Sequence, residues 1–93
     1  MAVIRVSSSS RTPSVAGAIA GMMRENGTSE ILCIGAATIN IGVKAIAVAR
    51  EFLAKDRIDI ACIPVFETLF INGNERTAIK FIIFNQKEKS DIL

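Results

Sequence analysis

The residues that could do chemistry in this sequence are few, and they favour binding over catalysis. The chain has no histidine, tryptophan or tyrosine, so acid–base catalysis near neutral pH would depend on carboxylates, lysines or thiols with displaced pKa values. The acidic residues are dispersed, and no serine or cysteine has an evident activating base. Cys33 and Cys62 cannot complete a tetrahedral zinc site without histidine ligands. We therefore expect no catalytic residues, metal site, cofactor or small-molecule substrate.

Candidate anion-binding groups fall in two loops that each precede a predicted helix. Ser7–Thr12 contains four serines, an arginine and a threonine, and Gly35–Thr38 offers a flexible turn. Helix N-termini attract anions through unpaired amides and the helix dipole, so Ser9, Ser10 and Arg11 are candidates to hold a phosphate. Serine-rich loops also commonly do no more than cap a helix, and both interpretations stay open.

Other basic side chains could also either bind nucleic acid or serve only as solvated surface groups. Arg76 and Lys80 project from one face of the predicted last strand, where they could follow a nucleic-acid groove or form an ordinary solvated edge. Lys44 and Arg50 lie on the second predicted helix. For Arg50 we expect an ion pair with a carboxylate such as Glu51, or with one from a neighbouring subunit.

Length and composition predict one domain that associates with copies of itself. Ninety-three residues leave almost no room for a second core, and we assign residues 1–85 to one domain and residues 86–93 to a loose charged tail. Hydrophobic residues make up 51% of the chain, more apolar surface than a lone domain of this size buries easily. The formal net charge is only +2, so affinity for nucleic acid would depend on where the basic groups lie.

The sequence predicts neither membrane insertion nor export. No apolar run approaches the ~20 residues of a bilayer-spanning helix, and the N-terminus lacks the apolar core of a signal peptide. Both cysteines lie in apolar, strand-like runs, as buried thiols in a reducing compartment do. We therefore expect a cytoplasmic location, with nucleoid association as an option.

Periodicity and turn residues predict the element order β-α-β-α-β-β, an α/β two-layer fold. The predicted elements are strand Ala2–Val6, helix Thr12–Asn26 with Gly27 as its left-handed cap, strand Ser29–Gly35, helix Thr38–Lys55, an extended run Ile58–Ile71 interrupted at Pro64 by a bulge or a switch to an edge, and strand Arg76–Phe84. An Asn72–Gly73 hairpin turn joins the last two. Because the β-α-β crossover makes its strands parallel, both strand-to-helix loops open on one edge of the sheet.

The two predicted helices carry features that suggest close contacts. Gly17 and Gly21 in the first helix together cost roughly 2 kcal/mol relative to alanine, which predicts close approach of another backbone. The second helix has an apolar arc roughly 220° wide, about twice what packing on one sheet requires. We expect the excess to face the first helix or a second subunit, and the candidate interface residues are Ile41, Ala45, Val48 and Phe52.

Three separated stretches, Ser14–Gly21, Val43–Arg50 and Glu75–Lys80, with Cys62–Pro64 between them, resemble the stage V sporulation protein S family. The resemblance covers about Val3 to Phe84 and departs at Ile41–Gly42. It implies an Alba-like fold, with a mixed four-stranded sheet and two helices on one face. Alba is a small archaeal chromatin protein that dimerises and binds DNA or RNA.

The resemblance implies that nucleic acid meets the loop after the first strand, the start of the second helix and the hairpin arm. On this chain those regions contain Arg11, Lys44, Arg76 and Lys80. The sequence is thus interpreted as a bacterial regulator that binds DNA or RNA through backbone phosphates, as a dimer or tetramer, and affects sporulation or developmental gene expression. The alternative is an oligomeric protein-interaction or scaffold domain without nucleic-acid binding.

Overall fold

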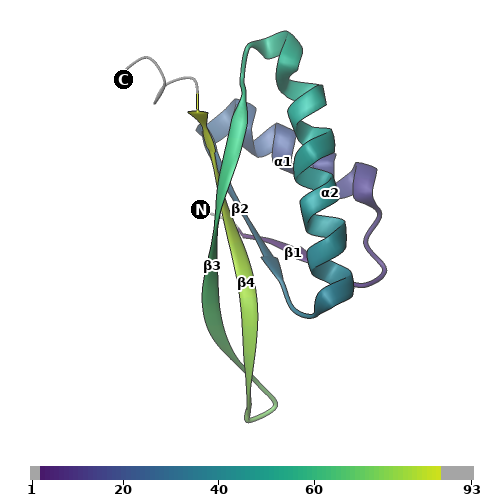
Figure 1. Ribbon diagram of the computed structural model, residues 1–93, viewed down its shortest axis with the longest axis vertical. Coiled ribbons are helices and arrows are strands. Elements are labelled where there is room, and N and C mark those ends of the chain that lie inside the picture. Colours follow the sequence, from purple (N-terminus) through teal and green to yellow (C-terminus); the bar gives the residue numbers. More distant parts are fainter. Residues whose placement is uncertain (1–2, 87–93) are drawn as a thin grey trace.

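The computed structural model describes residues 3–86, which form a mixed four-stranded sheet with both helices on one side (Figure 1). The elements are β1 (Ile4–Val6), α1 (Thr12–Asn26), β2 (Thr28–Cys33), α2 (Ala36–Leu53), a 3-10 turn η1 (Ala54–Asp56), β3 (Ile60–Ile71) and β4 (Asn74–Asn85). The sheet order is β1-β2-β4-β3. The predicted β-α-β-α-β-β order and fold class are confirmed.

Strand register places β4 in the middle of the sheet and lets the β3–β4 hairpin extend beyond it. β1 is parallel to β2, whereas β4 is antiparallel to both β2 and β3. Asn72 and Gly73 both have positive φ, 52° and 79°, which suits the two-residue turn of a twisted hairpin. The hairpin projects past the helices (Figure 1), and the molecule measures 44 × 28 × 20 Å.

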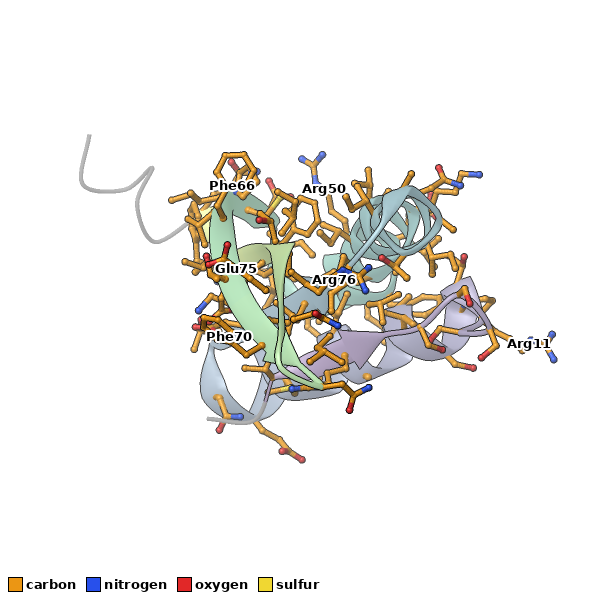
Figure 2. The ribbon with its side chains drawn as sticks, turned by 90° about the horizontal axis from the view of Figure 1, so that it is seen from below. Arg11, Arg50, Phe66, Phe70, Glu75 and Arg76 are labelled. Carbon is orange, nitrogen blue, oxygen red and sulfur yellow. The ribbon has the colours of Figure 1, made fainter. Side chains whose placement is uncertain are left out.

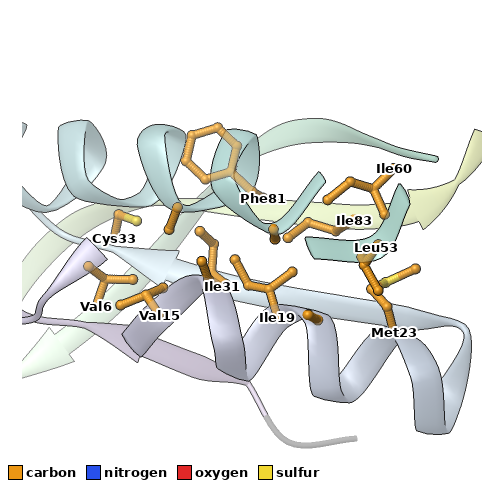
Figure 3. Packing of buried hydrophobic residues seen from close by; sticks show 14 residues of the cluster. Val6, Val15, Ile19, Met23, Ile31, Cys33, Leu53, Ile60, Phe81 and Ile83 are labelled. Carbon is orange, nitrogen blue, oxygen red and sulfur yellow. The ribbon is translucent and has the colours of Figure 1, made fainter. Parts of the chain in front are cut away.

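The core lies between the helices and the covered face of the sheet (Figure 3). Ile31 and Ile83 are fully buried on neighbouring strands, and Ile19 of α1 and Leu53 of α2 are fully buried opposite them. The buried stripe of α2 is made mostly of small residues, Thr38, Gly42, Ala45, Ala49 and Leu53. Small side chains let α2 lie close to the sheet.

Several local predictions need correction. α2 begins two residues earlier than predicted and ends at Leu53, because the chain tightens into η1. Pro64 neither bulges nor interrupts β3; it pairs with Phe81 inside one continuous edge strand, where a missing amide is tolerated. Gln86, assigned to the tail, is hydrogen-bonded to Asp59 through both its backbone and its side chain. The rest of the predicted tail, residues 87–93, lies outside the described residues.

The predicted close contact at Gly17 and Gly21 does not form within the subunit. A Cβ built at either glycine meets nothing within 4 Å in the described part of the chain, apart from the adjacent helix backbone. Gly17 is exposed and Gly21 is half-buried. Neither glycine is therefore required for packing within the subunit.

Candidate nucleic-acid interface

Three segments form one end of the molecule, here called the loop end. They are the Ser7–Arg11 loop, the first turns of α2 and the Asn72–Gly73 turn of the hairpin (Figure 1). The first two lie on one edge of the sheet because β1 and β2 are parallel, as the sequence predicted. The hairpin reaches the same end because β4 runs antiparallel to β2.

The serine loop is held in a compact turn by its own hydroxyl groups. The Ser7 backbone N–H donates to Ser10 Oγ (2.9 Å), and Ser7 Oγ shares hydrogen bonds with Ser9 Oγ (3.0 Å) and Ser10 Oγ (3.2 Å). Arg11 is the N-cap residue of α1, and it makes no side-chain cap hydrogen bond. The first amides of α1 are thus left without a side-chain acceptor from the cap residue.

The start of α2 has the same property. Gly35 is the N-cap and offers no side chain. The Thr38 hydroxyl donates to the Ile34 and Gly35 carbonyls, both at 2.8 Å. Uncapped N-terminal amides keep their attraction for anions.

Arg11, Lys44 and Arg76 are exposed, and none has an ion pair among residues 3–86. Figure 2, which looks at the loop end, shows that Arg11 projects at the side far from the hairpin. In the same view, Arg76 lies on the hairpin side that faces the body of the molecule. Lys44 lies in the third turn of α2. Arg11 therefore lies at the loop end and Arg76 near the hairpin turn, whereas Lys44 lies halfway along α2, so the structure does not cluster the three residues.

Lys80, unlike Arg11, Lys44 and Arg76, has ion-pair partners within the subunit. Its side chain is 23% exposed and lies between two carboxylates, with Nζ 3.5 Å from Glu30 Oε1 and 3.8 Å from Glu67 Oε1. Lys80 faces Leu32 on β2 and Val65 on β3, so neighbouring strands supply both partners. Its charge is already balanced and is not available to a polyanion.

Replacing Lys80 with methionine is therefore expected to affect stability and not binding. The change leaves two like charges close together, and we expect urea denaturation to show a loss of less than about 1 kcal/mol, because the group is partly solvated. Affinity for nucleic acid should stay within about twofold of wild type. If the Lys80 variant kept its stability but lost much of its affinity for nucleic acid, Lys80 would have to contact nucleic acid directly.

Within the subunit, Arg50 pairs with Asp59 and not with Glu51. Its guanidinium contacts both oxygens of the Asp59 carboxylate, and Gln86 Nε2 donates to Asp59 Oδ2 (2.8 Å). The hydrogen bond with Asp59 raises the pKa of the exposed Arg50 side chain. This cluster joins α2 to the start of β3 and the end of β4, a contact between segments that the sequence separates.

The candidate interface residues on α2 are largely used within the subunit. Ala45 is fully buried, and Ile41 and Val48 pack against the core. Only Phe52 is exposed. Ala45 is thus unavailable to a partner, because the arc that contains it covers the chain's own core.

Two exposed phenylalanines on β3 escaped the sequence analysis. Phe66 is 81% exposed and Phe70 is 73% exposed. They lie with Glu75 on the side of the hairpin opposite Arg76 (Figure 2). The alternation of Phe66, Thr68 and Phe70 in an edge strand was the available signal, since these residues share one face of β3.

The two thiols and any grouped metal ligands are the remaining candidates for chemistry within residues 3–86. Burial raises the pKa of both the Cys33 and Cys62 thiols, which favours the protonated, weakly nucleophilic form. Within residues 3–86 no group of three or more potential metal ligands comes together. None of the helices in this range is long and apolar enough to cross a membrane.

Comparison with known families places this fold and sequence. The family model of stage V sporulation protein S matches residues 2–86, which include all described helices and strands. This match covers nearly the whole of the 93-residue chain. The chain therefore belongs to the stage V sporulation protein S family, a family of sporulation-related proteins.

Proposed function

We propose that the protein binds DNA or RNA through backbone phosphates at the loop end, associates with copies of itself, and acts as a regulator of sporulation or developmental gene expression and not as an enzyme. The observation that carries the proposal is the placement of Arg11, Lys44 and Arg76. These three exposed basic side chains come from three segments, and each lacks an ion pair within the described residues. Phosphate contacts of this kind position a protein on nucleic acid without specifying sequence.

Both helix N-termini at the loop end support the same proposal. Neither α1 nor α2 has a side-chain cap, so their amides add to the field of the basic groups. A second copy would double the number of basic groups and extend the positive surface. Arg76 and Glu75 point to opposite sides of the hairpin (Figure 2), so we propose that nucleic acid approaches from the Arg76 side.

Replacing Arg11, Lys44 and Arg76 together with alanine should weaken binding about tenfold or more at low salt, because phosphate contacts are lost. The slope of log K against log salt for a duplex should flatten by about 0.9 for each lost contact. Fluorescence anisotropy with labelled duplex DNA and with single-stranded RNA measures both quantities. Lys55→Ala is the matched control, because it removes an exposed positive charge at the opposite end of α2. Equal weakening by Lys55→Ala would contradict the location of the site.

The exposed Phe66 and Phe70 rings favour a second candidate, an oligomeric protein-interaction domain whose basic residues only keep it in solution. Large exposed aromatic side chains are typical of interaction surfaces. A gel shift at near-physiological salt separates the two functions when it is combined with light scattering. A stable oligomer that shifts neither DNA nor RNA would favour the second candidate.

A further inference from the structure

The face of the sheet opposite the helices, here called the open sheet face, is apolar where a solvated face would be polar. Side chains alternate along each strand, so the neighbours of the core residues in β2, β3 and β4 point away from the helices. They include Leu32, Ile63, Val65, Ile82 and Phe84. A sheet with one solvated face ordinarily carries polar side chains on that face. The composition of the open sheet face is therefore that of a covered surface.

Within residues 3–86 the subunit does not cover this face itself, because both helices lie on the other side of the sheet (Figure 1). Ile63 is 48% exposed, and Val65, Ile82 and Phe84 are half-buried. Leu32 is buried by its neighbours in the sheet, but it does not belong to the core cluster beneath the helices. Ile82 lies opposite Ile63 on the neighbouring strand, so the apolar side chains form one patch across several strands.

The open sheet face is large enough for a contact between subunits. The four strands lie ~4.8 Å apart, and the first eight residues of β3, Ile60–Glu67, extend ~26 Å, so this part of the face has a flat area on the order of 500 Å². The accessible surface of the side chains exceeds this flat area. Standard interfaces begin at about 600 Å² for each partner. The face therefore has room for one.

We infer that the open sheet face packs against the open sheet face of a second copy of this chain. This contact is separate from an open apolar groove of about 890 Å³ that lies between α2 and β3 and has Val43 and Cys62 in its lining. Cys62 and Ile63 point to opposite faces of β3, so a contact through one surface leaves the other free. The inference deepens the self-association part of the proposed function and does not depend on nucleic-acid binding.

The charges on the open sheet face suit a copy of the same chain. Lys80 lies between Glu30 and Glu67, so this cluster keeps one carboxylate in excess. Arg5 lies opposite Leu32 on the same face, is exposed and forms no ion pair within residues 3–86. A two-fold axis normal to the face can place the guanidinium of each copy near the excess carboxylate of the other. The same carboxylate would repel a polyanion.

The apolar patch lies away from the hairpin turn. Ile82 precedes the end of β4 by three residues, whereas Arg76 lies six residues before Ile82, about 20 Å closer to the turn. Two copies that meet at Ile63 and Ile82 therefore leave Arg76 at the rim of the contact. The two-layer packing of sheet on sheet requires only apolar side chains on both faces, which each copy supplies.

Light scattering after size exclusion, without nucleic acid, tests the inference on the full chain. Ile63→Gln and Ile82→Gln should each raise the dissociation constant of the wild-type assembly at least about tenfold and halve its mass on dilution. Circular dichroism checks that both variants fold. Ala18→Gln is the matched control, because it places the same side chain on the exposed side of α1. A monomeric wild type, or dissociation by Ile63→Gln and not by a folded Ile82→Gln, would overturn the inference.

An introduced tryptophan supplies an independent measurement, because the chain has none of its own. In Ile63→Trp the emission maximum should move to longer wavelength, and acrylamide quenching should increase, as dilution lowers the mass of the assembly. Ala18→Trp should show neither change. If the Ile63→Trp emission stays constant while the mass falls, the contact lies elsewhere and the inference is wrong. An assembly that fails to bind nucleic acid would contradict only the proposed nucleic-acid binding, and a monomer that binds it would contradict only this inference.

Discussion

Gly42→Ala is expected to destabilise the protein by about 1–3 kcal/mol, although alanine is the better helix former. A Cβ at this position would lie 2.8 Å from Cys33 Sγ and 3.1 Å from Ile31 Cδ1. Both neighbours are fully buried in the core. α2 would have to lift from the sheet, and urea denaturation should report the loss.

A double-mutant cycle identifies the cause. Cys33→Ala alone should destabilise the protein, because it removes a buried sulfur atom. Combined with Gly42→Ala it should cost less than the sum of the two single changes, with a coupling of about 0.5–3 kcal/mol, because the new methyl group occupies the space of the sulfur. If the two effects simply add, the Cβ is accommodated elsewhere and Cys33 does not set the spacing of α2.

The order of elements could be predicted because its signals are local. The Asn72–Gly73 turn, the glycine that follows α1 and the alternation along β4 each depend on a few adjacent residues. The side of α2 that faces the core could not be predicted in the same way. The predicted apolar arc contains the buried stripe, but Gly42, Ala45 and Ala49 are among the smallest residues of the helix, so hydrophobicity did not show which part of the arc faces the core.

The candidate site was predicted only in part, because strand lengths decide which charges find partners. Arg76 and Lys80 share one face of β4, as the alternation predicted. β2 pairs with β4 only as far as Ile79, so Lys80 has strands on both sides and Arg76 has one. Glu30 and Glu67 then neutralise Lys80 while Arg76 stays unpaired within the described residues. Long-range register of this kind is not encoded in the spacing of the two basic residues.

The structure also separates two surfaces that composition alone could not distinguish. Arg11 and Arg76 lie at or near the loop end, and the open apolar groove lies between α2 and β3. Contacts through the groove or through the open sheet face would leave the loop ends of both copies exposed. The proposed binding to a polyanion and the proposed self-association would then use different residues, and we expect that each can be removed by mutation without the other.

Replacing Gly17 and Gly21 together with alanine is expected to stabilise the protein by about 2 kcal/mol. Both positions have helical neighbours and room for a Cβ, so each alanine recovers about 1 kcal/mol of helix propensity. For a domain of this size, thermal denaturation should show an increase in Tm of about 4–8 °C for each kcal/mol.

Gly27→Ala is the control for this pair, because Gly27 ends α1 with φ 75° and alanine would be strained there. It should lower Tm while the Gly17 and Gly21 changes raise it, although all three add one methyl group to open space. The double variant could instead be less stable than wild type, by an amount that grows with protein concentration. That result would indicate that the glycine face of α1 contacts another chain. Self-association would then involve α1, where the small residues of the helix first suggested a close approach.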